Sequence, residues 1–263
     1  MPNTHSDGSY RLVWFQHFHK AGGSSVIATA AKNGERFYPQ HHNGNPVDAN
    51  GWEIPIWQMD VAAQRDFIDH CEEIGVTFIA TEWGSQNYVA LRDDPRVFSL
   101  TLIRDPWDRL VSCYKFDLAR GHTKAVPIHR YFPHHSLPYR RPDYYTRSLA
   151  EGMGMSKGSH EKMLASAREN LEAIDFRANL YNRSATQAFC DLLGWTNFKL
   201  VSNKTPNLLV GTLQQALRKD FGFLYRQGMM SSKSRNEIYG FRDKFEELNA
   251  MDRELFNGLQ ETC

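Results

Sequence analysis

The sequence predicts an α/β protein in which helices flank a central parallel sheet. Two observations support this class. Short apolar runs, typical of buried strands, occur at residues 12–18, 76–81 and 97–103. Segments with a helical period lie between these runs and after them. Strands that alternate with helices form parallel sheets, because each parallel connection must cross over the sheet.

In the first half of the chain, glycines and other turn residues mark the ends of the expected strands and helices. The apolar run at 12–18 is followed by a glycine turn and then by a helical segment at 24–32. A second helix is expected at 61–74, where apolar residues recur near a 3.6-residue period and Gly75 suits the C-terminal end. Residues 43–50 are rich in Asn, Gly and Pro and are expected to form a loop.

The second half begins with an expected helix at 107–120. Asp105 can cap its N-terminus, and Pro106 suits the first helical position. Residues 121–147 combine prolines with histidines, arginines and aromatic residues, and a long irregular segment inside a compact domain is often functional. Further helices are expected at 161–174, 178–193 and 237–259, and a strand that leads into a loop is expected at 198–207.

Length and charge limit the class of protein. The chain has 263 residues, of which 41% are hydrophobic, so it can bury a substantial core. We expect a disordered lead at 1–9 and a single domain at 10–263, with residues 121–160 as a loop or insert. The formal net charge of +1 argues against a general nucleic-acid-binding protein, which would be strongly basic.

The sequence also predicts a cytoplasmic protein. Cys71, Cys113, Cys190 and Cys263 lie far apart and form no C-x-x-C pair, so they are expected to be reduced thiols. The first residues lack the apolar region of a signal peptide. No run of about 18 apolar residues occurs, so no membrane span is expected.

The first motif with chemical meaning is VWFQHFHKAGGSSV at residues 13–26. A strand that leaves through a glycine-rich turn into a helix forms an anion site, because backbone N–H groups and the helix N-terminus face the anion. Gly22 and Gly23 allow a close approach, Ser24 and Ser25 add hydroxyl donors, and Lys20 adds a positive charge. On its own, the stretch also fits a plain strand–turn–helix corner with an incidental lysine.

The position of Lys20 distinguishes this turn from the nucleotide-binding P-loop. That loop, G-x-x-x-x-G-K-[ST], places its lysine after the glycines, whereas Lys20 precedes them. The order argues against a standard ATP or GTP site.

The second motif is LTLIRDPWDRLVSCYKF at residues 100–116. It places Arg104 at the end of an expected strand and Ser112 eight residues later, in the following helix. Taken alone, the two residues also fit a structural ion-pair partner and an ordinary helix hydroxyl.

Together the two motifs resemble the sulfotransferases that use 3′-phosphoadenosine 5′-phosphosulfate (PAPS), in the carbohydrate-type branch that includes heparan sulfate 2-O-sulfotransferase. FQHFHKAGGSSV is similar to the 5′-phosphosulfate loop F-x-H-x-P-K-T-G-G-T-S, and IRDPWDRLVSCYKF to the 3′-phosphate motif I-R-D-P-x-x-R-L-x-S-x-Y-x-F. LNAMDRELFNGL at 248–259 resembles the C-terminal D-x-x-L-[YF] helix. Two residues depart from the pattern: His19 stands where the family has proline, and Ala21 where it has threonine or serine.

The resemblance implies a P-loop-like three-layer fold and a reaction. A sulfuryl group would pass in line from PAPS to a hydroxyl or amine of a carbohydrate or small-molecule acceptor, without a metal. Lys20 would stabilise the charge that grows on the leaving phosphate. The implied cofactor-binding residues are Lys20, Ala21, Gly22, Gly23, Ser24 and Ser25 for the phosphosulfate, Arg104 and Ser112 for the 3′-phosphate, and Lys204 and Thr205 in a covering loop.

A general base must take the proton of the acceptor. The resemblance implies a His or Glu after the strand that precedes the 3′-phosphate strand, and Glu82 follows that strand, 22 residues before Arg104. His17 and His19 are rivals because they flank Lys20, and Glu82 could instead be a solvated or ion-paired residue. Acceptor contacts are assigned to His17, His19, Arg140 and Arg141.

Two other functions stay open at this point. A nucleoside-phosphate or metabolite kinase would keep the fold but needs magnesium and a lysine after the glycines. A non-catalytic binding module would keep the nucleotide pocket alone. The histidines at 121–147 match no zinc spacing.

Overall fold

The computed structural model describes residues 9–120, 122–123, 127–134, 136–150, 159–196, 238 and 240–261. Its contacts divide the chain into two compact units, which are described separately. Unit 1 comprises Met1–Arg104, Tyr145–Val201 and Glu254–Cys263, and unit 2 comprises Asp105–Tyr144 and Ser202–Arg253. The expected single domain at 10–263 stays a prediction, and the expected lead at 1–9 lies outside the described residues apart from Ser9.

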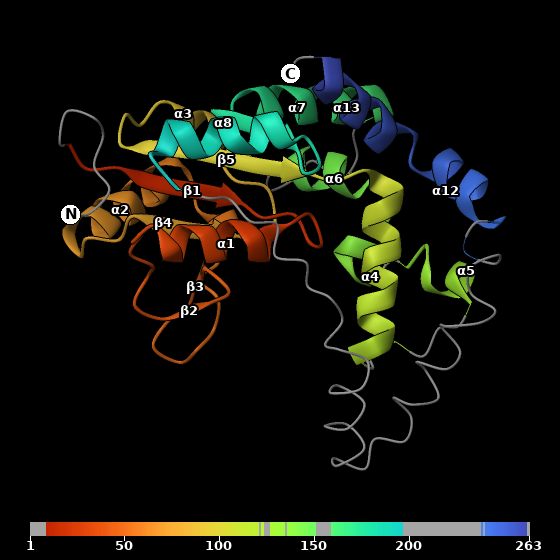
Figure 1. Ribbon diagram of the computed structural model, residues 1–263, viewed down its shortest axis with the longest axis horizontal. Coiled ribbons are helices and arrows are strands. Elements are labelled where there is room, and N and C mark those ends of the chain that lie inside the picture. The colour runs from red at the N-terminus through yellow and green to blue at the C-terminus, as the bar shows by residue number, and fades with distance from the viewer. Residues whose placement is uncertain are drawn as a thin grey trace, which may run out of the picture. The chain divides into compact units, whose positions relative to one another are not determined.

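Unit 1 is built on a parallel sheet, as the sequence predicts. Four strands follow the order β4-β1-β5-β6, with β1 and β5 side by side and pointing the same way (Figure 1). Gln16 of β1 pairs in register with Thr81 of β4 and Thr101 of β5. The strand bounds are Leu12–Gln16 (β1), Phe78–Thr81 (β4), Val97–Ile103 (β5) and Phe176–Asn179 (β6).

Helices cover both faces of this sheet. On one face, α1 (Gly23–Lys32) and α8 (Arg183–Leu193) bury apolar side chains in one cluster with Phe15 and Leu100. On the other face, the indole of Trp14 meets the ring of Phe67 edge-on at 6.1 Å. Phe67 belongs to α2 (Val61–Glu73). The short helix α3 (Tyr88–Arg92) contacts both α2 and α7 (His160–Glu172). The fold class is therefore α/β with a parallel sheet between helices.

The strand order creates one special position in the sheet. From β1 the chain moves to β4 on one side, and it then returns past β1 to β5 and β6 on the other. The chain therefore leaves the neighbouring strands β1 and β5 in opposite directions, toward β4 and toward β6. Ligands of open α/β sheets bind at such a switch point, outside the carboxyl ends of the strands.

Smaller elements surround the sheet. A short hairpin of β2 (His41–His42) and β3 (Asn45–Pro46) occupies part of the expected loop at 43–50. It is followed by a 3₁₀ turn, η1 (Ile56–Gln58). The helix α6 (Tyr144–Ala150) begins within the segment at 121–147 that was expected to be irregular.

Unit 2 contains α4 (Pro106–Arg120), which confirms the expected helix at 107–120 almost to the residue. Its apolar side packs Trp107 and Leu110 in a cluster with Phe245. Among its described residues this unit also contains α5 (Ile128–Tyr131), η2 (Pro138–Arg140) and α12 (Arg242–Leu248), so the irregular segment contains short helical turns.

Two sequence predictions are wrong in detail. The expected helix at 178–193 begins only at Arg183, because the Asn182 side chain accepts a hydrogen bond from the Ala185 N–H and caps it there. The expected helix at 237–259 breaks at Asn249 into α12 and α13 (Ala250–Glu261), because the Asn249 Oδ1 accepts a hydrogen bond from the Asp143 N–H. The expected strand at 198–207 lies outside the described residues.

Two further expectations concern the cysteines and the helices. Cys71, Cys113 and Cys190 are buried free thiols, and burial raises the pKa of Cys71 to about 12. Cys263 lies outside the described residues. In the part of the chain that the structure describes, every helix is too short or too polar to span a bilayer.

Candidate functional site

The loop that follows β1 adopts a conformation that favours glycine. Gly22 has a φ of 94°, and the non-glycine residue Lys20 has a φ of 63°, in the sparsely populated left-handed region. The Ala21 N–H donates to the Phe18 carbonyl, and the Ser25 N–H donates to the Gly22 carbonyl as α1 begins. Strained backbone of this kind persists where the surroundings fix it, often at ligand sites.

The two glycines of this loop leave room for neighbouring side chains. A Cβ on Gly22 would collide with the side chain of Leu180, and a Cβ on Gly23 would collide with the ring of His17. Gly22 is the N-cap of α1 and forms no side-chain hydrogen bond with the first turn of the helix. The backbone N–H groups of that turn therefore face the loop. Backbone amides at a helix N-terminus attract an anion, and the loop brings Lys20 to the same turn.

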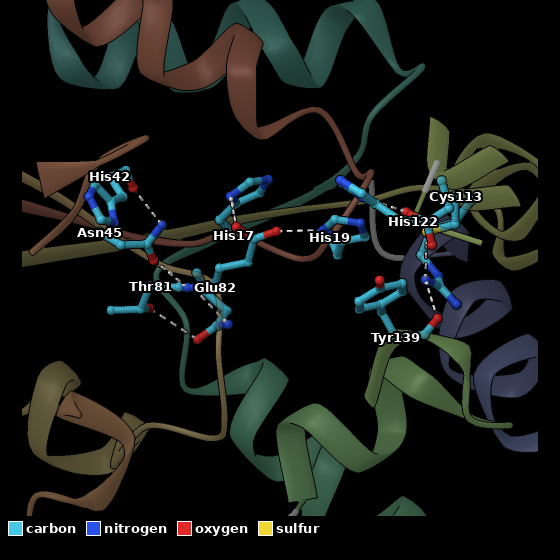
Figure 2. A network of polar contacts seen from close by, with 12 residues as sticks. His17, His19, His42, Asn45, Thr81, Glu82, Cys113, His122 and Tyr139 are labelled. Atoms are coloured by element: carbon cyan, nitrogen blue, oxygen red, sulfur yellow. Dashed lines mark hydrogen bonds and ion pairs between the residues drawn. The ribbon is translucent and has the colours of Figure 1, made fainter. Parts of the chain in front are cut away.

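Glu82 follows β4, and its carboxylate lies between two histidines of the β1 loop (Figure 2). His19 Nδ1 is 2.6 Å from Glu82 Oε1, and His17 Nδ1 is 3.7 Å from Glu82 Oε2. The Glu82 backbone N–H donates to the Asn45 Oδ1 at 2.8 Å. The Asn45 side-chain amide in turn donates to the His42 carbonyl at 3.0 Å. The hairpin therefore fixes the backbone of Glu82.

Burial and charge act in opposite directions on this cluster. Burial raises the pKa of Glu82, but the hydrogen bond from His19 and the electrostatic effects of the neighbouring His17, His19 and Lys20 outweigh it, so the pKa lies below its ordinary value of 4.5. Burial lowers the pKa of His17, against the pull of the Glu82 charge. Glu82 is therefore an ionised carboxylate at neutral pH, and His17 is a neutral ring.

Substitution of His19 tests this balance. In a His19→Ala variant the pKa of Glu82 should rise, because the largest of the lowering effects is removed while the desolvation remains. The measurement is the titration of the Glu82 side chain by ¹³C NMR. His70→Ala is the control, since this half-exposed histidine pairs with Glu73 instead. An unchanged Glu82 titration in the His19 variant would contradict the proposed cause.

Arg104 follows β5 and is held through its backbone. The Tyr145 hydroxyl accepts from the Arg104 N–H at 3.1 Å and donates to its carbonyl at 3.0 Å. The ring of Tyr145 also meets Phe18 of the β1 loop edge-on at 5.0 Å, so Tyr145 links the two loops. The guanidinium lies 5.5 Å from the centre of the Tyr181 ring, and its buried Nε has no hydrogen-bond partner among the described residues.

The structure therefore brings together the central part of the predicted site. Lys20, Glu82 and Arg104 follow β1, β4 and β5, three neighbouring parallel strands, at the same edge of the sheet. Ala21 and Gly22 lie between β1 and α1, and Gly23, Ser24 and Ser25 form the first turn of α1. This edge includes the switch point between β1 and β5.

The other predicted residues lie in unit 2 or outside the described residues. Ser112 is half-buried on α4 in unit 2, so its role toward Arg104 stays a prediction. Lys204 and Thr205 lie outside the described residues. Arg141 is half-buried in unit 2, and its assignment to the acceptor also stays a prediction.

Arg140 has a structural environment within unit 2. Its side chain is 5% exposed and donates to the Asp117 Oδ2 at 2.6 Å. Its guanidinium also lies 4.2 Å from the centre of the Tyr131 ring. A buried ion pair of this kind cannot lose one partner without leaving the other charge uncompensated, so Arg140 is committed to the packing of unit 2.

Sequence reasoning missed Asn45, Tyr145 and Tyr181. Asn45 lies in a segment that was expected to be a simple loop, and Tyr145 lies in the segment that was expected to be irregular. Neither belongs to a motif, because their contacts with Glu82 and Arg104 connect positions 37 and 41 residues apart. Tyr181 follows β6, a strand that the sequence did not predict.

No protein-family model and no curated protein matches the sequence. Among the described residues, no group of three or more His, Cys, Asp and Glu side chains is arranged to hold a metal ion. The geometry of the site is therefore the basis for assigning a function.

Proposed function

We propose that the protein is a sulfotransferase that uses PAPS and acts on a hydroxyl or amine of a carbohydrate or small-molecule acceptor. The observation that carries this proposal is the pair of cationic groups at the ends of adjacent strands. Lys20 stands in a left-handed glycine turn after β1, and Arg104 stands after β5 with a buried Nε that has no partner among the described residues. The motifs around both residues resemble the two phosphate-binding motifs of that family.

The chain's residues fit the two ends of the nucleotide. The turn at Gly22 and the uncapped start of α1 suit the 5′-phosphosulfate, because backbone N–H groups and the helix dipole favour an anion there. The unpartnered Nε of Arg104 suits the 3′-phosphate, since a guanidinium forms charge-assisted hydrogen bonds with phosphate oxygens. The same reading assigns a P-loop-like type to the fold and a cofactor role to Ser112, Lys204 and Thr205.

The reaction assigns separate roles to Lys20 and Glu82. PAPS supplies an activated sulfuryl group whose bond to the 5′-phosphate oxygen breaks as a bond from sulfur to the acceptor atom forms. Lys20 stabilises the negative charge that develops on that phosphate, which lowers the barrier more than it stabilises the ground state. Glu82 is ionised at neutral pH and accepts the proton that the acceptor loses. The hydrogen bond from His19 holds its carboxylate in position, with the ring of His17 beside it.

A thermal-shift comparison tests the cofactor directly. Adenosine 3′,5′-bisphosphate (PAP), the product of the donor, should raise the melting temperature, because a ligand that binds only the native state stabilises it. ATP with magnesium should have a smaller effect, since Lys20 precedes the glycines. Stabilisation by ATP and magnesium alone would favour a kinase. Binding of PAP without sulfate transfer to any acceptor would favour a non-catalytic module.

The cellular setting follows from the thiols. Three buried free cysteines, Cys71, Cys113 and Cys190, suit a reducing compartment, and we propose that the protein is cytoplasmic.

A further inference from the structure

The turn that follows β6 contacts both cationic loops of the site. Leu180 is buried, and its backbone N–H donates to the Ile103 carbonyl at 2.8 Å, which continues the pairing of β6 with β5. Its side chain lies against Gly22, where an added Cβ would collide with it. The next residue, Tyr181, has its ring centre 5.5 Å from the guanidinium carbon of Arg104. One turn therefore touches the glycine turn after β1 and the arginine after β5.

Hydrogen bonds within this turn fix the backbone of Tyr181. The Asn179 Oδ1 accepts from the Tyr181 N–H at 3.0 Å, and the Asn179 carbonyl accepts from the Asn182 N–H at 2.9 Å. Asn182 is also the N-cap of α8, where its Oδ1 accepts from the Ala185 N–H at 3.1 Å. Asparagine side chains that bond the backbone two residues on stabilise a tight turn. The backbone that carries the Tyr181 ring is therefore held between the end of β6 and the start of α8.

The contact between Tyr181 and Arg104 suits a cation that must bind a further anion. A guanidinium within about 6 Å of the centre of an aromatic ring is attracted by the face of that ring. A carboxylate partner would occupy the N–H donors of the guanidinium, whereas a ring face leaves those donors for a phosphate. Tyr145 fixes the backbone of Arg104, and Tyr181 acts on its side chain. Tyr181 is 49% exposed, so this large ring stands at the surface beside the arginine instead of filling the core.

We propose that Tyr181 is a positioning residue for Arg104, and that its ring holds the guanidinium in the orientation that binds the 3′-phosphate. The inference rests on the proposed sulfotransferase function, because it assigns Tyr181 to one end of that nucleotide. A side chain that is oriented before binding loses less conformational entropy when the ligand arrives. Tyr181 therefore contributes to the affinity for the nucleotide, through Arg104, and not to the transfer step.

Calorimetry with PAP and with adenosine 5′-monophosphate (AMP) tests this role. Tyr181→Leu removes the ring and keeps an apolar side chain, so the affinity for PAP should fall about three- to tenfold, while the affinity for AMP should not change. Tyr181→Phe keeps the ring and should retain the affinity for PAP. In both variants kcat at saturating PAPS should stay unchanged. Trp52→Leu is the matched control, because it removes a largely exposed aromatic ring elsewhere in unit 1, and it should leave both affinities unchanged.

A measurement on the free chain separates this inference from the proposed function. The Arg104 Nε–H signal in a ¹⁵N NMR spectrum, assigned by its loss in Arg104→Ala, should shift in Tyr181→Leu and stay in place in Trp52→Leu. An unmoved signal, an unchanged affinity for PAP in Tyr181→Leu, or an equal loss of PAP and AMP affinity would overturn the positioning role. A Tyr181→Phe variant as weak as Tyr181→Leu would also overturn it. A shifted signal in a chain that binds PAP no more tightly than AMP would instead overturn the proposed function, on which the 3′-phosphate role depends.

Discussion

Replacing Lys20 with alanine should reduce turnover by about 10²- to 10³-fold, the usual effect of removing one group that stabilises transition-state charge. The affinity for PAP should change much less, because the backbone of the turn at Gly22 and the start of α1 still face the phosphate. Lys20 differs in this respect from a simple binding residue. Its charge is needed most when the bond between sulfur and the phosphate oxygen is breaking.

The measurement is kcat by single-turnover transfer of labelled sulfate, together with the dissociation constant of PAP by calorimetry. Lys32→Ala is the matched control, since this exposed lysine lies in the last turn of α1, at the opposite end of the helix from the loop. Turnover that survives in the Lys20 variant would contradict the leaving-group role. A parallel loss of turnover in the Lys32 variant would point to a general effect on α1.

Replacing Arg104 with alanine should weaken PAP binding by about 10- to 100-fold, since a hydrogen bond to a charged group contributes roughly 1.5–3 kcal/mol. Turnover at saturating donor should change less than in the Lys20 variant, because the 3′-phosphate is remote from the reacting atoms. Arg104→Lys should recover only part of the affinity, because an ammonium does not reproduce the two parallel hydrogen bonds of a guanidinium.

Arg92→Ala provides the control for Arg104. Arg92 is an exposed arginine in the last turn of α3, where it pairs with Asp93. Calorimetric titration with PAP should show no change in this variant. The melting temperature of the Arg104 variants checks that they fold. The Tyr145 hydrogen bonds should persist in these variants, because they use the Arg104 backbone and need no side chain at position 104.

The strands and the site were predictable where the signal is local. β1 and β5 are apolar runs that are almost wholly buried, so hydrophobicity alone reveals them. Glu82 and Arg104 each follow such a run, and neighbouring parallel strands bring their ends together. The order β4-β1-β5-β6 then makes the loops after β1 and β5 diverge, which a single sequence indicates only through its motifs.

The missed elements depend on distant contacts. β6 reads FRAN, in which only Ala178 is fully buried, so it has neither an apolar run nor alternation, and the expected helix at 178–193 overlaps its last two residues. The break at Asn249 depends on Asp143, more than a hundred residues away. The hydrogen bond from the Glu82 N–H to Asn45 joins the end of β4 to the hairpin across 37 residues, and no local pattern brings these two residues together.

The central claim is that Lys20 and Arg104 bind opposite ends of one doubly phosphorylated adenosine. Calorimetry with PAP and with adenosine 5′-monophosphate, which lacks the 3′-phosphate, tests it most directly. The wild-type chain should bind PAP at least about tenfold more tightly, and this preference should disappear in Arg104→Ala, since a hydrogen bond to a charged group accounts for roughly this difference. Equal binding of the two nucleotides by the wild-type chain, or a preference for PAP that persists in Arg104→Ala, would contradict the account.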